Sequence, residues 1–245
     1  LRMRDLVGAA GRWFLVVLFS SQVGKVNLPV LPNISLDQIV LVFLFLAFFT
    51  QVAIGQRRLL PFNLIEAAMV LFAFIALASK GYAGHLLMKG EGLKIANLFN
   101  GFVFPFAMYF LGKHLIDDER KLLGFVGMLL GLGLYLAATA AAEMIPALHG
   151  MVFPRYIMDP DLGIHFGRGR GPILNAAVNG TIMGMIFMIG LILVTARGTA
   201  PWRRRLAALV LVVLPAGIYF SQTRACWLGF LVALGVIAKF YPRVR

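Results

Sequence analysis

Residues 173–196, with the sequence ILNAAVNGTIMGMIFMIGLILVTA, decide the fold of this chain. The stretch contains no charged residue, and it exceeds the roughly 20 residues that an α-helix needs to cross a bilayer. Its apolar residues are continuous rather than alternating, which disfavours a β-barrel. The stretch therefore predicts a transmembrane helix, whose backbone polar groups are bonded within the helix because lipid offers no partners.

The rest of the chain has the same character. Of its 245 residues, 60% are hydrophobic and 13% are charged, and the mean hydropathy is +0.87. Soluble domains have about 45–50% apolar and about 25% charged residues. We therefore expect an all-α, polytopic integral membrane protein, with residues 1–245 forming a single membrane domain. Together with the opening stretch, seven other apolar stretches predict about eight transmembrane helices: 6–23, 38–54, 64–79, 95–111, 122–142, 206–219 and 226–240.

The positive charges indicate how the helices cross the membrane. A net charge of +13 could indicate a nucleic-acid partner. However, most of the Lys and Arg residues lie in short clusters between apolar stretches, as membrane topology requires, so we expect no nucleic acid. Alternate connections carry most of these clusters, at 57–58, 113–121, 197–205 and 239–245. We expect this side, and both ends of the chain, to be cytoplasmic.

Two of the connections on the other side contain arginines beside small residues. Arg168 and Arg170 lie in HFGRGRGPILN (165–175), and Arg224 ends the short turn SQTR (221–224). An arginine at the edge of a span is normally paired, extended toward lipid phosphates, or functional. Guanidinium groups bind phosphate oxygens in pairs, and glycines let the backbone approach an anion. We expect Arg168 and Arg224 to share a diphosphate, with Arg170 as a less essential third member; contact with lipid phosphates is the alternative.

These residues also resemble a known family. RGRGPILN is similar to the Arg-x-x-Gly-x-x-x-Asn signature of the O-antigen ligase and polymerase family, with Arg168, Gly171 and Asn175 at the matching positions. SQTRACWLGFLVAL (221–234) resembles the family's second arginine segment, in which Arg224 and Trp227 match. This sequence departs from the pattern at Thr223, where Ser is usual, and at Ala225, where Gly is common.

The resemblance implies a glycosyltransferase of lipopolysaccharide biosynthesis. Such an enzyme moves a glycan from undecaprenyl diphosphate to an acceptor glycan or to lipid A-core at the outer face of the inner membrane. The implied reaction is inverting, independent of metal and without a cofactor. Arg168 and Arg224 would stabilise the charge of the departing diphosphate. Membrane lipids and other membrane proteins are the further partners that we expect.

The resemblance also leaves the catalytic base open. In the family, a large external loop that usually carries a catalytic His follows the second arginine segment, whereas this sequence ends at Arg245, just after the last apolar stretch. We expect a partial chain that lacks this loop and the last helices. His165 is the local candidate for a base. The pair Asp159 and Asp161 predicts a polar loop turn rather than a metal site.

Two carboxylates, Glu66 and Glu143, lie near the ends of spans and need not be buried. Two other functions remain open. One is a non-catalytic membrane subunit derived from the same family. The other is a transporter of an anionic substrate, although no charged pair lies in the middle of a predicted span. The continuation of the gene would distinguish the enzyme from the subunit.

Overall fold

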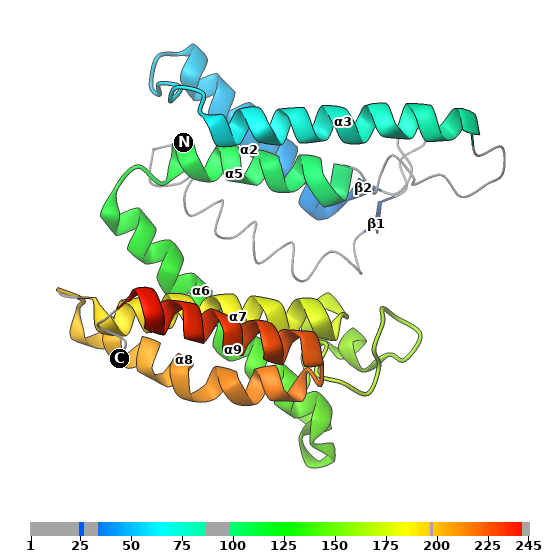
Figure 1. Cartoon of the computed structure of the whole chain (residues 1–245), viewed down its shortest axis with the longest axis vertical. Helices are drawn as coiled ribbons and strands as arrows, with labels where there is room; N and C mark the ends of the chain where they lie inside the picture. The colour runs from blue at the N-terminus through cyan, green and yellow to red at the C-terminus, as the bar shows by residue number, and fades with distance from the viewer. Residues whose placement is uncertain (1–24, 27–33, 87–98, 197, 242–245) are drawn as a thin grey trace. The chain divides into compact units, whose positions relative to one another are not determined.

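The computed structural model describes residues 25–26, 34–86, 99–196 and 198–241 (Figure 1). Helices dominate these residues, and the two strands β1 (Lys25–Val26) and β2 (Ile34–Ser35) form one short antiparallel pair with Lys25 opposite Ser35. Each predicted apolar stretch from residue 38 onward overlaps a helix in the described part of the chain. The first predicted stretch, 6–23, and residues 95–98 lie outside the described residues. Among the described residues, the contacts separate 39–121 from a second unit that contains 25–26, 34–38 and 122–241.

Where the structure describes it, the first unit contains α2 (Leu36–Ala53) apart from its first three residues, α3 (Leu64–Leu86) and α5 (Phe104–Leu115). A π-helical turn, η1 (Phe99–Val103), leads directly into α5. Aromatic rings join α2 to α5, because Phe48 is fully buried and lies edge-on to Phe110, with ring centroids 5.8 Å apart. The apolar stretch of α2 therefore packs through one aromatic face.

Polar groups hold the start of α3. Asn63 and Glu66 form a reciprocal cap: the N–H of Asn63 donates to Glu66 Oε2 at 2.7 Å, and the N–H of Glu66 donates to Asn63 Oδ1 at 3.0 Å. This arrangement satisfies backbone donors that the first turn of a helix leaves free. Lys113 of α5 donates to the same carboxylate at 2.8 Å. Glu66 is therefore buried, at 5% exposed, although a position near the end of a span did not require it.

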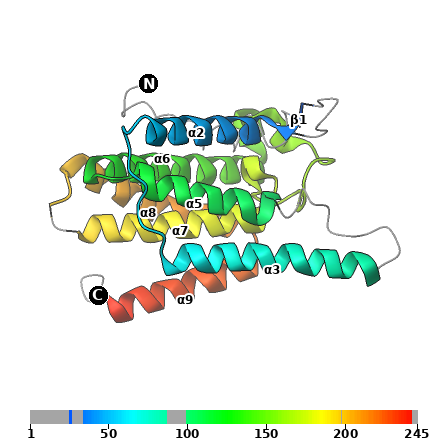
Figure 2. The ribbon, with the colours of Figure 1, turned by 90° about the horizontal axis from the view of Figure 1, so that it is seen from above.

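The second unit contains α6 (Glu119–Met144), α7 (Ala176–Thr195), α8 (Pro201–Phe220) and α9 (Arg224–Phe240). The first three residues of α6 belong to the first unit. Its core gathers Leu136 of α6, Met183 of α7 and Leu214 of α8, each fully buried. Close approach depends on Gly217, because a Cβ there would lie 2.7 Å from the side chains of Ala137 and Met183. In this unit, α7 and α8 lie side by side along their length (Figure 2).

Among the described helices, α6 and α7 are long and apolar enough to cross a membrane, on length and composition alone. This is weak support for a membrane protein. Within the second unit, α6 ends, α7 begins, α8 ends and α9 begins at one end of the helices (Figure 2). The loop 145–175 and the turn 221–223 lie at this end, whereas the basic cluster 203–205 lies at the opposite end.

Candidate functional site

The α6–α7 loop (residues 145–175) is built from short turns rather than from one extended segment. Three 3₁₀ turns lie in it: η2 (Pro146–Met151), η3 (Arg155–Met158) and η4 (Gly171–Ile173). The N–H of Asp161 donates to Asp159 Oδ1 at 3.0 Å, so these two acids form the polar turn that the sequence predicted. Tyr156 closes the loop on itself, because its hydroxyl donates to the carbonyl of Pro172 at 3.1 Å.

Two residues of the first motif have clear structural roles. Asn175 is the N-cap of α7, and its side-chain oxygen accepts from the N–H groups of Ala177 at 3.0 Å and Val178 at 3.3 Å. Gly171 has φ +58°, in the left-handed region that favours glycine, and a Cβ there would lie 2.9 Å from Asn179 Oδ1. These two motif positions therefore set the path of the chain into α7.

Gly169 brings the two arginine segments to the same end of the second unit. Its N–H donates to the carbonyl of Phe220, the last residue of α8, at 2.9 Å. Arg168 immediately precedes Gly169, and Arg224 begins α9 four residues after Phe220. Arg168 is partly exposed and Arg224 is exposed. Both cations therefore flank a single backbone hydrogen bond, and both can reach solvent.

Trp227 fixes the start of α9 against the end of α8. Its indole Nε1–H donates to the carbonyl of Ile218 at 3.0 Å, and its ring stacks on Tyr219 with centroids 5.6 Å apart. Ser221, which is fully buried in the turn, donates to the same carbonyl at 2.7 Å. The predicted motif residue Trp227 thus holds the turn that precedes Arg224.

Arg170 differs from its two neighbours in the predicted site. It is 1% exposed, and its Nη2 donates to the carbonyl of Ile157 at 2.7 Å. The same guanidinium also bonds the carbonyls of Asp159 and Leu162. Burial lowers the pKa of this guanidinium, and the nearby charges of Glu143 and Asp159 oppose that effect.

The role of Arg170 as a less essential third ligand for phosphate stays a prediction. In the structure three backbone carbonyls of the loop converge on its guanidinium, which closes the loop from inside. The sequence places Arg168 and Arg170 two residues apart but does not indicate which of them faces inward. The structure turns Arg170 inward and leaves Arg168 partly exposed.

Glu143 is a residue of the site whose role the sequence did not predict. Its carboxylate accepts from the N–H of Arg170 at 3.1 Å and from the N–H of Gly171 at 2.7 Å. Its side chain is 4% exposed and lies 4.0 Å from Arg170 Nε. This burial is possible because two backbone donors and a guanidinium offset part of its cost.

Asn179 is the other residue that the sequence analysis missed. It is fully buried on the second turn of α7, and its Nδ2 donates to the carbonyl of Gly169 at 3.0 Å. Its Oδ1 has no hydrogen-bond partner within the described part of the chain. The signal was available, since Asn179 is a polar side chain inside an otherwise apolar stretch, where such residues need a partner.

His165, the local candidate for a base, is exposed and has φ +63°. Its carbonyl accepts from the N–H of Arg168 at 3.3 Å. It therefore belongs to the same turn as Arg168. In the described segments, no group of three or more His, Cys, Asp and Glu side chains is arranged to hold a metal ion.

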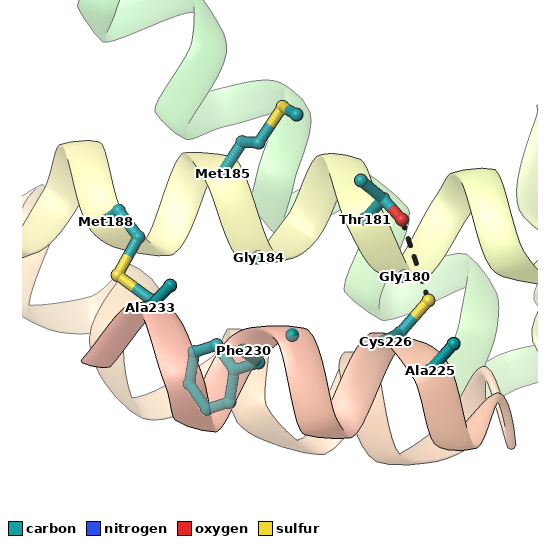
Figure 3. Close-up of a pocket in the computed structure, with 10 residues that line it drawn as sticks. Gly180, Thr181, Gly184, Met185, Met188, Ala225, Cys226, Phe230 and Ala233 are labelled. Carbon is teal, nitrogen blue, oxygen red and sulfur yellow. Dashed lines mark hydrogen bonds between the residues drawn. The ribbon is translucent and has the colours of Figure 1, made fainter. Parts of the chain in front are cut away.

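An apolar groove of about 250 Å³ runs between α7 and α9 (Figure 3). Small residues widen it, among them Gly180, Gly184 and Gly229. The Thr181 hydroxyl and the Cys226 sulfur lie 3.6 Å apart at one end, beside Ala225. Because Ala225 follows Arg224 directly, the groove begins next to the exposed cation of α9.

Comparison of this chain with protein-family models, with curated proteins and with solved structures found no match.

Proposed function

We propose that this chain belongs to a membrane-embedded glycosyltransferase of the O-antigen ligase and polymerase type. In this proposal Arg168 and Arg224 hold the diphosphate of an undecaprenyl-linked glycan while the glycan is transferred. The observation that carries the proposal is the hydrogen bond from Gly169 N–H to Phe220 O. It joins the two segments that resemble the family's motifs, although these segments are far apart in the sequence.

The proposal includes a bilayer around the helices. It is supported by the length and composition of α6 and α7 and by the many large apolar side chains exposed on α3 and α9, such as Phe74 and Leu228. Eight crossings with cytoplasmic ends would place Arg168 and Arg224 at the outer edge. The basic cluster 203–205, at the opposite end of the second unit, would then face the cytoplasm.

The chemistry that this site supports is charge stabilisation. The acceptor hydroxyl gives its proton to a general base, for which His165 is the local candidate, and its oxygen bonds to the anomeric carbon as the bond between that carbon and the diphosphate oxygen breaks. The lipid diphosphate departs with the electron pair of that bond. Two guanidinium groups, each able to form a pair of parallel hydrogen bonds to phosphate oxygens, stabilise this charge as it develops.

The test is transfer from a lipid-linked donor in membranes that contain the full-length protein. Truncating one member of a desolvated charge pair costs about 2–5 kcal/mol. Arg224→Ala should therefore reduce transfer by roughly 30-fold or more, at about 1.4 kcal/mol per decade. Arg224→Lys should restore part of the activity, because an ammonium group cannot form the bidentate fork.

The matched control is Arg155→Ala, which removes an exposed arginine of the same loop and should leave transfer unchanged. Expression and helical content are compared across all variants. Full activity of both Arg168→Ala and Arg224→Ala would leave these arginines as lipid anchors and would overturn the proposal.

Orientation is tested separately by labelling single cysteines in a Cys226→Ala background. A cysteine at position 168 should react with an impermeant maleimide added outside intact cells, whereas a cysteine at position 204 should react after lysis only. The opposite pattern would place the arginine edge in the cytoplasm, where a donor presented at the outer face could not reach it.

A further inference from the structure

Three consecutive loop residues, Gly169, Arg170 and Gly171, are bonded to three different helices. Gly169 donates to Phe220 O of α8, as described above, and accepts from Asn179 Nδ2 of α7 at 3.0 Å. The next two N–H groups donate to the carboxylate of Glu143 on α6. The backbone on the C-terminal side of Arg168 is thus fixed from three directions.

Steric fit reinforces these bonds. A Cβ on Gly169 would lie 2.7 Å from Ala140 Cβ and 3.0 Å from Phe220 O, closer than ordinary side-chain contacts allow. The loop backbone therefore lies directly against α6 and α8. A side chain at position 169 would push the loop away from both helices and weaken the hydrogen bond to Phe220.

Asn179 is a buried residue of α7 whose side chain bonds to the backbone of Gly169. Burying a side-chain amide costs free energy unless the amide is hydrogen-bonded. The amide of Asn179 is fully buried, and its Nδ2 donates to the carbonyl of Gly169. The donor comes from a rigid helix that also carries the core residue Met183 one turn further on. The position of Gly169 is therefore set relative to α7 as well as to α8.

We propose that Asn179 is a positioning residue that sets the spacing between Arg168 and Arg224 through the backbone of Gly169. The proposal rests on the function proposed above for the two arginines. Asn179 does not touch the diphosphate. It holds Gly169 against the last residue of α8, so that the cation before Gly169 and the cation that begins α9 face one anion.

The experiment measures this spacing without reference to activity. Nitroxide labels are attached to cysteines at positions 168 and 224 of the full-length protein in a Cys226→Ala background, and dipolar broadening is recorded in lipid nanodiscs. Asn179→Ala should weaken the broadening and widen the distance distribution. Thr181→Val is the matched control: it removes a side-chain hydrogen bond from the same helix, to Ala177 O at 2.8 Å, but does not touch the loop.

A second measurement connects the spacing to the ligand. With both arginines in place, the Kd for undecaprenyl diphosphate is measured per folded molecule, and Asn179→Ala should raise it about fivefold to tenfold, as expected for the loss of one buried hydrogen bond. Thr181→Val should leave the Kd unchanged. A purely structural role of Asn179 would lower the yield of folded protein without changing either the label spacing or this Kd.

Asn179→Leu, which branches at the same atom but has no hydrogen-bonding group, gives an independent variant if Asn179→Ala does not fold. Unchanged label spacing in a folded variant overturns the proposal, as does the failure of both variants to fold. A changed spacing with an unchanged Kd supports the positioning of the loop and instead contradicts the assignment of the diphosphate to the two arginines.

Discussion

The helices α3 and α7 are both strongly apolar, yet they pack in different ways. In α7 the buried residues recur every three or four positions along the whole helix, at Ala176, Asn179, Gly180, Met183, Ile186, Phe187, Gly190 and Leu193. Over residues 64–79 of α3, by contrast, Glu66 is the one buried residue. The difference is that the small residues of α7 lie on its buried stripe, so that α8 and α9 can approach closely, whereas both the small and the large side chains of α3 lie largely exposed over residues 64–79.

This contrast shows that apolar composition predicts a helix but not its neighbours. Gly180 and Gly190 decide the packing of α7: a Cβ on Gly180 would lie 2.8 Å from Ser221 Oγ, and one on Gly190 would lie 3.4 Å from Val210. In α3, Leu64 is 85% exposed and Phe74 is 67% exposed. A bilayer or another protein would have to cover such a surface.

The largest expected effect comes from Arg170, the buried cation of the second unit. Arg170→Ala removes three carbonyl contacts and leaves Glu143 buried without its cation, so we expect a loss of about 3–5 kcal/mol of stability. The measurement is the free energy of unfolding of the detergent-solubilised protein. Arg155→Ala, at an exposed arginine of the same loop, should change it by less than about 0.5 kcal/mol. Equal effects of the two substitutions would show that the loop is not closed from inside.

A matched pair of isoleucines tests the contrast between α7 and α3 directly. Ile186 is 2% exposed and Ile75 is 53% exposed. Ile186→Ala should cost about 2–4 kcal/mol, because it leaves a cavity in the core of the second unit. Ile75→Ala should stay within about 0.5 kcal/mol. A large loss for Ile75→Ala in the same unfolding assay would show that α3 is covered by a partner in the assay.

A smaller effect is expected at the turn before Arg224. Trp227→Phe keeps an aromatic ring beside Tyr219 but removes the hydrogen bond to Ile218 O, and should cost about 0.5–1.5 kcal/mol. Thermal unfolding followed by circular dichroism measures this loss. Trp202→Phe is the control, since Trp202 is 58% exposed on α8. If the two changes have the same effect, the indole of Trp227 does not hold the turn.

The smallest effect concerns an exposed ion pair in the first unit. A hydrogen bond from Lys121 lowers the pKa of Asp117 below its ordinary value. Because the folded-state pKa is the lower one, the pair stabilises the fold above the unfolded pKa of about 3.9, and the contribution is lost as the pH falls through the folded pKa. Asp117→Asn should cost about 0.2–1 kcal/mol at neutral pH and almost nothing in acid. A loss of the same size at both pH values would contradict this origin.

The sequence predicted the helices well and the contacts between them poorly. The apolar stretches 122–142 and 173–196 correspond to α6 and α7 within a few residues, because continuous apolar runs allow few other structures. Gly171 and Asn175 were singled out by the resemblance to a family motif, whereas their roles as a left-handed turn and an N-cap came from the structure. Arg168 and Arg170 are equivalent in local sequence, and their different burial depends on carbonyls at residues 157–162, whose convergence no spacing rule describes.

Glu143 and Asn179 illustrate the same limit. Each is one polar residue at or within an apolar stretch, and each belongs to the site because it bonds to a residue that is distant in the sequence. Glu143 accepts from the N–H of Gly171 at the other end of the α6–α7 loop, and Asn179 donates to the carbonyl of Gly169, which precedes α7. A sequence shows that such a residue needs a partner, but the fold determines which partner it finds.

The hydrogen bond between Gly169 and Phe220 also has a consequence for the order of synthesis. As the chain leaves the ribosome, Glu143 is made before Arg170, so those two can meet early. The carbonyl of Phe220 is made later, after α7 and almost all of α8. The loop that carries Arg168 can therefore close around Arg170 first and dock on α8 only when the hairpin of α7 and α8 is complete. Elongation of α8, rather than of the loop itself, sets the earliest moment at which the loop can dock.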